Sequence, residues 1–246
     1  MILRNGHILR FSLIVFLALI FTATSCTNQQ NNDTSDSEPQ VFTKAMQDTI
    51  SPDQALQRLQ NGNARFVDGK LKYKDYREQF EQTAAGQYPH STVLTCIDSR
   101  SGAEQFFDVS IGEIFNTRVA GNVVNEDVLG SMEFATAVAG SKLIAVVGHS
   151  NCGAVKGAID NAELGHLTGL VKKIKPAIDQ VSDTLQPRTS DNKEFVNAVT
   201  REHVERVIDQ ILSRSDVIQK QVEAGEIKIV GGTHNLATGE VTFFDM

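Results

Sequence analysis

Residues 91–96 read STVLTC and residues 142–148 read KLIAVVG, and these two runs decide the fold. Both are short, apolar and rich in β-branched side chains, which is typical of buried strands in a parallel sheet. Segments with helical spacing lie between and after them, and this alternation favours a sheet with helices on both faces. The sequence therefore predicts an α/β domain built around these two strands.

The other predicted elements continue the alternation. Further strands are predicted at residues 114–119, 227–232 and 241–244. Helices are predicted from residue 52, at 125–139, from residue 153, and at 167–181 and 192–224. A short turn at Thr238-Gly239 joins the last two strands, which suits an antiparallel pair because parallel strands need a long crossover. We expect a mainly parallel central β-sheet flanked by helices, with an antiparallel edge strand; the helix from residue 52 could pack on a partner subunit.

Candidate metal ligands stand where the first two strands end. Cys96 closes one strand, and His149 and Cys152 follow the other on a single βα turn. Because the carboxyl ends of parallel strands meet at one edge of a sheet, the three side chains could come together. Two thiolates and one imidazole are typical of a catalytic zinc site, which keeps its fourth position for water or substrate. The sequence predicts Zn²⁺ as the cofactor.

A structural disulfide between Cys96 and Cys152 is the simpler alternative, and it would form in an oxidising compartment. That alternative leaves the neighbouring Asp98, Arg100 and His149 without a role. The metal site accounts for all five residues and is favoured.

The motif C-x-D-x-R at residues 96–100, followed by H-x-x-C at residues 149–152, resembles the zinc motif of the β-class carbonic anhydrases. Segments 113–115, 118–122 and 148–153 are also similar to that family, and the likeness runs from about Ser51 to the C-terminus. The resemblance implies reversible hydration of carbon dioxide to bicarbonate and a proton. It also implies zinc as the only cofactor and a homodimer or higher homo-oligomer.

Asp98 and Arg100 suit catalytic roles beside such a zinc ion. Zinc lowers the pKa of bound water and so supplies hydroxide, which attacks an electrophilic carbon such as that of carbon dioxide. Asp98 can accept a hydrogen bond from this hydroxide, and Arg100 can hold Asp98 ionised through a two-pronged pair. Two thiolates make zinc a weaker Lewis acid than three histidines do, so we expect activity to favour mildly alkaline pH.

In one subgroup of the family the aspartate that matches Asp98 ligates zinc at lower pH. The resemblance therefore also implies a closed state with Asp98 as a fourth ligand. The inhibitory bicarbonate pocket of that subgroup is missing here, because Val93 stands in place of a tryptophan and Ser101 in place of a valine.

The resemblance to the other subgroup assigns substrate binding to Gln87 and Phe115, while Phe134 stands where a tyrosine is common. Gly153 joins these candidates, because it opens the helix after Cys152 and the helix dipole favours an anion there. The simpler alternatives are a solvated loop glutamine at Gln87 and core aromatics at Phe115 and Phe134.

The N-terminus predicts export. Arg4 and Arg10 precede the apolar run 11–21, which is short for a membrane span and fits a secretory signal. Residues 23–26 read ATSC and resemble a relaxed bacterial lipobox, with Ala23 where leucine is usual. A conventional signal peptidase site at the same small residues, with an incidental Cys26, is the alternative.

The polar segment that follows has the composition of a disordered tether. We predict a lipoprotein-type signal peptide at 1–25, an acylated Cys26 with its tether at 26–45, and the zinc domain at 46–246. The protein would then be an exported bacterial lipoprotein, periplasmic or held on a membrane through its lipid anchor.

Charge and loop chemistry exclude two other classes of partner. The formal net charge of −7 becomes −9 without residues 1–25, which contain two arginines and no acidic residue. Such an acidic chain lacks the electrostatic footprint of a nucleic-acid binder. Residues 148–153 imitate a phosphate-binding loop, but Ala154 and Val155 follow where Lys and Ser or Thr are required, so nucleotide binding is not expected.

Two alternative functions remain open. A hydrolase of carbonyl sulfide or carbon disulfide could use the same scaffold, because these small molecules share the electrophilic carbon. A non-catalytic, zinc-stabilised binding protein would instead close its metal site with a fourth ligand and would have no use for Arg100.

Overall fold

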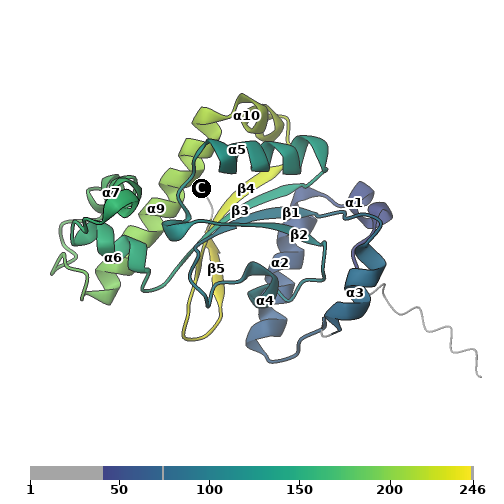
Figure 1. Cartoon of the computed structure of the whole chain (residues 1–246), viewed down its shortest axis with the longest axis horizontal. Coiled ribbons are helices and arrows are strands. Elements are labelled where there is room, and N and C mark those ends of the chain that lie inside the picture. Colours follow the sequence, from purple (N-terminus) through teal and green to yellow (C-terminus); the bar gives the residue numbers. More distant parts are fainter. Residues whose placement is uncertain (1–40, 74, 245–246) are drawn as a thin grey trace, which may run out of the picture. The chain divides into compact units, whose positions relative to one another are not determined.

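Five strands form one sheet in the order β2-β1-β3-β4-β5 (Figure 1). The strands are β1 Ser91–Thr95, β2 Ile114–Arg118, β3 Leu143–His149, β4 Lys228–His234 and β5 Val241–Phe244. Neighbours from β2 to β4 pair in parallel, and β4 pairs with β5 in antiparallel register. The predicted α/β fold with an antiparallel edge strand is confirmed.

The computed structural model describes residues 41–73 and 75–244. The predicted signal peptide, Cys26 and tether as far as residue 40 lie outside these residues. The first helix begins at Lys44, and Phe42 before it is already buried. Within the described ranges, no helix is both long enough and apolar enough to cross a membrane.

Helices cover both faces of the sheet (Figure 1). The helices of the first half are α1 Lys44–Thr49, α2 Pro52–Val67, α3 Tyr76–Thr83, α4 Ala103–Phe106 and α5 Glu126–Glu133. Those of the second half are α6 Gly153–Ile159, α7 Gly165–Lys172, α8 Lys175–Ile178, α9 Lys193–Arg214 and α10 Asp216–Glu223. Two short segments, the 3₁₀ turn η1 Ala120–Asn122 and the π-helical η2 Phe134–Val138, complete the set.

Alternation along the strands divides the core into two layers. Leu94 of β1 packs with apolar residues of α5, α9 and α10, whereas its neighbour Val93 packs on the opposite face with those of α2 and α4. This is the two-residue period of a strand that is buried on both faces. The sheet therefore holds the ends of β1 and β3 rigidly side by side.

The helix predicted from residue 52 forms as α2, with Pro52 in its first turn. Ser51 caps it, because Gln54 N donates to Ser51 Oγ and Ser51 N donates to Gln54 Oε1. Its apolar face packs on its own sheet, where Ala55 and Leu59 are fully buried. The sheet of the same chain covers this apolar face, so a contact of α2 with a partner subunit stays a prediction for its outer face.

Two predicted long helices are each broken in two. Residues 167–181 form α7 and α8, and Pro176 near the start of α8 favours a new helix start there. Residues 192–224 form α9 and α10, which separate at Ser215, where the backbone is extended and Oγ accepts from Ile218 N. The reason is capping chemistry, since a serine in this conformation ends one helix and starts another.

Candidate metal centre

The sheet brings the three predicted ligands together. Cys96 follows β1, His149 ends the adjacent β3, and Cys152 stands immediately before α6. One ligand atom of each residue lies within 4.8 Å of the others, and all three side chains are buried. Both cysteines are free thiols, without the disulfide that was the simpler alternative.

His149 presents an unused nitrogen to this cluster. Its Nδ1 lies 3.0 Å from the carbonyl oxygen of Ser150, and a carbonyl can only accept, so Nδ1 carries the proton. Nε2 therefore has a free lone pair, and this buried atom has no hydrogen-bond partner among the described residues. A buried polar atom left unsatisfied is costly, and a metal ligand removes that cost.

The two sulfurs differ in their protonation, and Cys96 is the one set up as a thiolate. The neighbouring Cys152 thiol holds the pKa of Cys96 well below its usual range, and the amide of Gly121 donates to Cys96 Sγ at 3.3 Å. Cys96 and burial raise the pKa of Cys152, although amides at the start of α6 donate to its sulfur. Without a metal the two sulfurs thus retain one proton, whereas a divalent cation would hold both deprotonated. The donor set fits zinc.

Asp98 is held beside the ligands by the predicted two-pronged pair. Arg100 Nε lies 2.9 Å from Asp98 Oδ1, and Arg100 Nη2 lies 2.8 Å from Oδ2. The guanidinium holds the pKa of Asp98 below its usual range, so the carboxylate is ionised. Asp98 Oδ2 is 3.9 Å from His149 Nε2, which places an anionic acceptor at the edge of the cluster.

Comparisons with known proteins agree with this geometry. The family model described as carbonic anhydrase matches residues 91–241. "Carbonic anhydrase 2" of Mycobacterium tuberculosis is 33% identical over 199 residues, which cover 79% of this chain and 94% of that protein. The carbonic anhydrase of Mycolicibacterium smegmatis is 35% identical over 193 residues, covering 78% and 92%.

Among solved structures, the β-carbonic anhydrase CcaA superposes with a TM-score of 0.61 at 25% identity, covering 77% of this chain and 95% of that one. A tetrameric β-carbonic anhydrase from Sordaria macrospora gives the same TM-score at 22% identity, covering 76% and 94%, and so supports the fold. The chain belongs to the β-carbonic anhydrase family. Hydration of carbon dioxide is the function of this family of zinc enzymes.

Arg118 contacts the backbone of the site, although its sequence position alone predicted no role for it. It ends β2, where it pairs in register with Thr95, the last residue of β1. Its Nε donates to the carbonyl of Cys96 at 3.0 Å, and Nη2 donates to the carbonyl of Asp98. Arg118 therefore fixes the backbone that carries a ligand and the acidic residue. Its position in the fold gives a clue to this role, because a cationic residue ends the strand that pairs with β1, and β1 leads into the C-x-D-x-R motif.

Gly121 and His203 also support the site without having been predicted. Gly121 has a φ of +61°, and a Cβ there would meet Ile174 Cδ1 at 2.7 Å, so a larger residue does not fit. His203 is buried, and its Nε2 lies 2.8 Å from the carbonyl oxygen of Gly121. It anchors the turn whose amide reaches Cys96.

The structure separates the predicted substrate residues. Gly153 opens α6 next to Cys152. Gln87 is exposed and precedes β1, so the length of that strand, about 17 Å at about 3.3 Å per residue, lies between it and Cys96. Phe115 pairs with Thr92 near the start of β2. Within one chain, Gly153 therefore lies next to the candidate metal ligands, whereas Gln87 and Phe115 lie outside that cluster.

Proposed function

We propose that this chain catalyses the zinc-dependent, reversible hydration of carbon dioxide to bicarbonate and a proton. The orphaned Nε2 of His149 beside two buried cysteine sulfurs carries the proposal. Cys96, His149 and Cys152 would hold Zn²⁺ and leave one position for water or substrate. When bound, zinc is a Lewis acid that activates water for attack on an electrophilic carbon.

The residues around the ligands would orient the reacting water. Asp98, ionised and 3.9 Å from His149 Nε2, can accept the hydrogen bond of an O–H group and so turn the oxygen lone pair toward the carbon. Arg100 engages both carboxylate oxygens and keeps Asp98 in this place. The helix dipole at the start of α6, where Gly153 lies, would favour the negative charge that develops on the substrate.

We propose further that Asp98 can leave Arg100 and close on the metal at low pH, as a fourth ligand. The short distance to His149 supports this, because only the side chain of Asp98 would have to turn. Crystal structures at low and high pH test it, since an open site at both pH values would exclude the switch.

Stopped-flow measurement of carbon dioxide hydration by the zinc-loaded chain tests the main proposal. We expect a zinc-dependent rate that rises toward mildly alkaline pH. Parallel assays with carbonyl sulfide and carbon disulfide separate the related hydrolase, which would turn these over faster than carbon dioxide. No zinc-dependent hydration at any pH would exclude the proposed function.

We propose that the active form is a homodimer or a higher assembly of such dimers. The edge strand β2 has one unpaired side among the described residues, and the ring of its own Phe115 lies 6.2 Å, between centroids, from that of Phe134 in η2. Phe134 is 53% exposed, so this pair leaves apolar surface open beside the edge strand. A second subunit on this edge would cover the pair and could bring its own Gln87 and Phe115 to the metal site.

We also propose that the chain is exported and anchored through acylated Cys26, after cleavage of residues 1–25. The support is the sequence alone: a basic start, a short apolar run, small residues before the cysteine and a polar tether. Fractionation of a bacterial host tests it. Wild-type protein should be found with membranes and Cys26→Ser should not, whereas wholly soluble wild-type protein with an unmodified Cys26 would favour simple secretion.

A further inference from the structure

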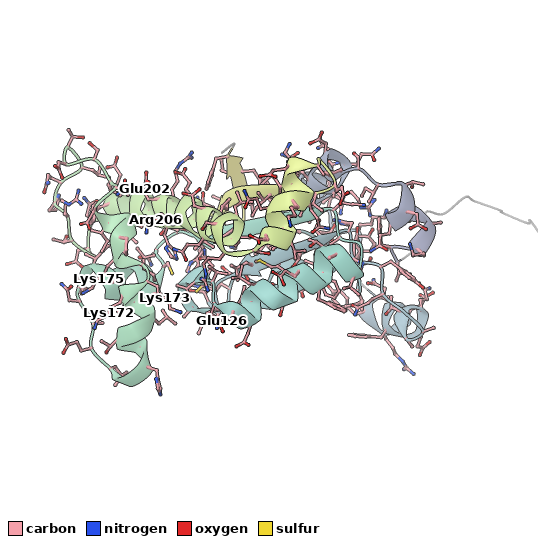
Figure 2. The ribbon with its side chains drawn as sticks, turned by 90° about the horizontal axis from the view of Figure 1, so that it is seen from above. Glu126, Lys172, Lys173, Lys175, Glu202 and Arg206 are labelled. Carbon is pink, nitrogen blue, oxygen red and sulfur yellow. The ribbon has the colours of Figure 1, made fainter. Side chains whose placement is uncertain are left out.

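A cavity of about 540 Å³ lies between α5, α8 and α9, and it contains none of the three metal-ligand candidates. Three cations line it: Lys173 just before α8, and Arg206 and Arg214 on α9. Figure 2 shows Lys173 and Arg206 on these two separate parts of the chain, with Lys172 and Lys175 near Lys173. The proposed function gives this cavity no role.

Arg206 is the least satisfied of these cations. Glu202 lies one helical turn before it, at a spacing where glutamate and arginine usually pair. Within residues 41–73 and 75–244 Arg206 nevertheless forms no ion pair, and its Nε is buried without a hydrogen-bond partner. An unsatisfied buried guanidinium N–H costs about 1–3 kcal/mol, so this group is poised for an acceptor that the chain does not supply.

The other two cations are also available. In the described part of the chain Lys173 makes no ion pair, and Arg214 makes only a long hydrogen bond of 3.4 Å to the carbonyl of Val124. Polar groups at this cavity thus exceed the partners that surround them.

Two carboxylates line the same cavity and must be weighed against the cations. Glu126 and Asp127 stand exposed in the first turn of α5 (Figure 2 labels Glu126). Both also line the neighbouring cavity along β2, so they form the ridge between the two cavities. Three cations therefore face two carboxylates at the rim, and the cavity keeps a positive charge in a chain whose net charge is −7.

We propose that this cavity binds a phosphate group, either of inorganic phosphate or of a small phosphate ester. A guanidinium presents a planar fork of donors that matches phosphate oxygens, and an ammonium adds a point charge. The volume is that of a small-molecule site and exceeds what one free phosphate ion fills, so there is room for the organic part of an ester.

Calorimetric titration of the full, zinc-loaded chain with inorganic phosphate and, separately, with glycerol 3-phosphate tests the site. We expect saturable binding with one site per chain, and Arg206→Gln should weaken it by at least about tenfold. Lys173→Gln should weaken it severalfold. The tighter of the two probes assigns the site to the free ion or to an ester.

Lys172→Gln is the matched control, because Lys172 precedes Lys173, is exposed and does not line the cavity. It removes the same charge and should change the dissociation constant by less than about twofold. Should Arg206→Gln fail to fold, Arg206→Lys keeps the charge without the fork and should still weaken binding. The absence of saturable binding, or an equal loss in Lys172→Gln, would overturn the proposal. Catalysis is not measured, so either result leaves the proposed function untouched.

Discussion

Arg100 is the strong partner of Asp98, and it keeps the Asp98 carboxylate ionised. Arg100 takes both carboxylate oxygens and also donates its own amide to Oδ1 at 3.0 Å. An anion held in this way stays ionised near neutral pH. The carboxylate is therefore suited to accepting a hydrogen bond and unsuited to acting as a general base.

We expect Asp98→Asn to keep its zinc and to lose about 10²-fold in the turnover number, because the amide has the same shape but no charge. Arg100→Ala should lose activity by the same route, since it frees Asp98. Metal analysis together with stopped-flow rates checks this. A normal rate in Asp98→Asn would rule out the orienting role.

Arg118 acts on the backbone of the site, so its removal should affect the metal. We expect Arg118→Gln to weaken zinc binding by about tenfold or more, because two carbonyls of the ligand loop lose their donor. Chelator competition measures the affinity. Arg77→Gln is the control, since the Arg77 side chain is 91% exposed and its ion pair of 3.6 Å lies within α3, away from the site. Equal affinities in both variants would leave Arg118 without a role at the metal.

At the scale of elements, α9 is tied to the site through His203. Burial lowers the pKa of His203 to about 4, below its ordinary value of about 6.5. The unfolded chain therefore binds the proton more readily, and stability that is complete above the unfolded pKa is lost as pH falls from about 6.5 to about 4.

For this histidine alone, we expect the free energy of unfolding to fall by about 2 kcal/mol between pH 7 and pH 5. His203→Gln keeps a donor for the Gly121 carbonyl but does not titrate. The free energy of unfolding of this variant should therefore fall by about 2 kcal/mol less than that of the wild type. Urea unfolding of both proteins at the two pH values measures the difference. Loss of metal in acid contributes to both proteins alike, and identical falls would refute the assignment.

The elements that the sequence predicted well are those with a local cause. The strands were recognisable because their apolar runs are buried on both faces, and α2 and α5 because Ser51, Pro52 and Asn125 cap or open them. The short helices α1, α3 and α4 were missed, since their few turns give no clear period. The breaks at Ser215 and before Pro176 were overlooked because the apolar pattern runs on across them.

The residues of the site also divide into those that a local sequence pattern predicts and those that it does not. Cys96, His149 and Cys152 could be predicted to meet, because parallel strands end at one edge, and the Asp98 pair lies within five residues of sequence. The contacts of Arg118 and His203 depend on packing between elements far apart in the sequence, so no local sequence pattern predicts them.

At the scale of the whole molecule, the separation of Gln87 from Cys96 makes a dimer testable. In a two-fold dimer where each site takes Gln87 from the partner subunit, Cys96→Ser and Gln87→Ala mixed in one dimer leave one site doubly changed and one intact. Neither variant alone has an intact site.

We therefore expect equal mixtures of the two weakly active variants, dissociated and reassembled, to recover about one quarter of the wild-type rate. Light scattering checks that dimers have formed. Recovery no greater than the mean of the separate variants would show that each chain uses its own Gln87, or none.

The most direct test of the account is zinc content measured beside the rate of carbon dioxide hydration, for wild type and for Cys96→Ser, His149→Ala and Cys152→Ser. The three ligand atoms lie within 4.8 Å of one another, so each variant removes one of only three firm bonds to the metal. The account predicts one zinc per wild-type chain with rapid hydration, and loss of both zinc and activity in every variant. A zinc-loaded wild type without hydration, or any one variant with full zinc and a normal rate, would contradict it.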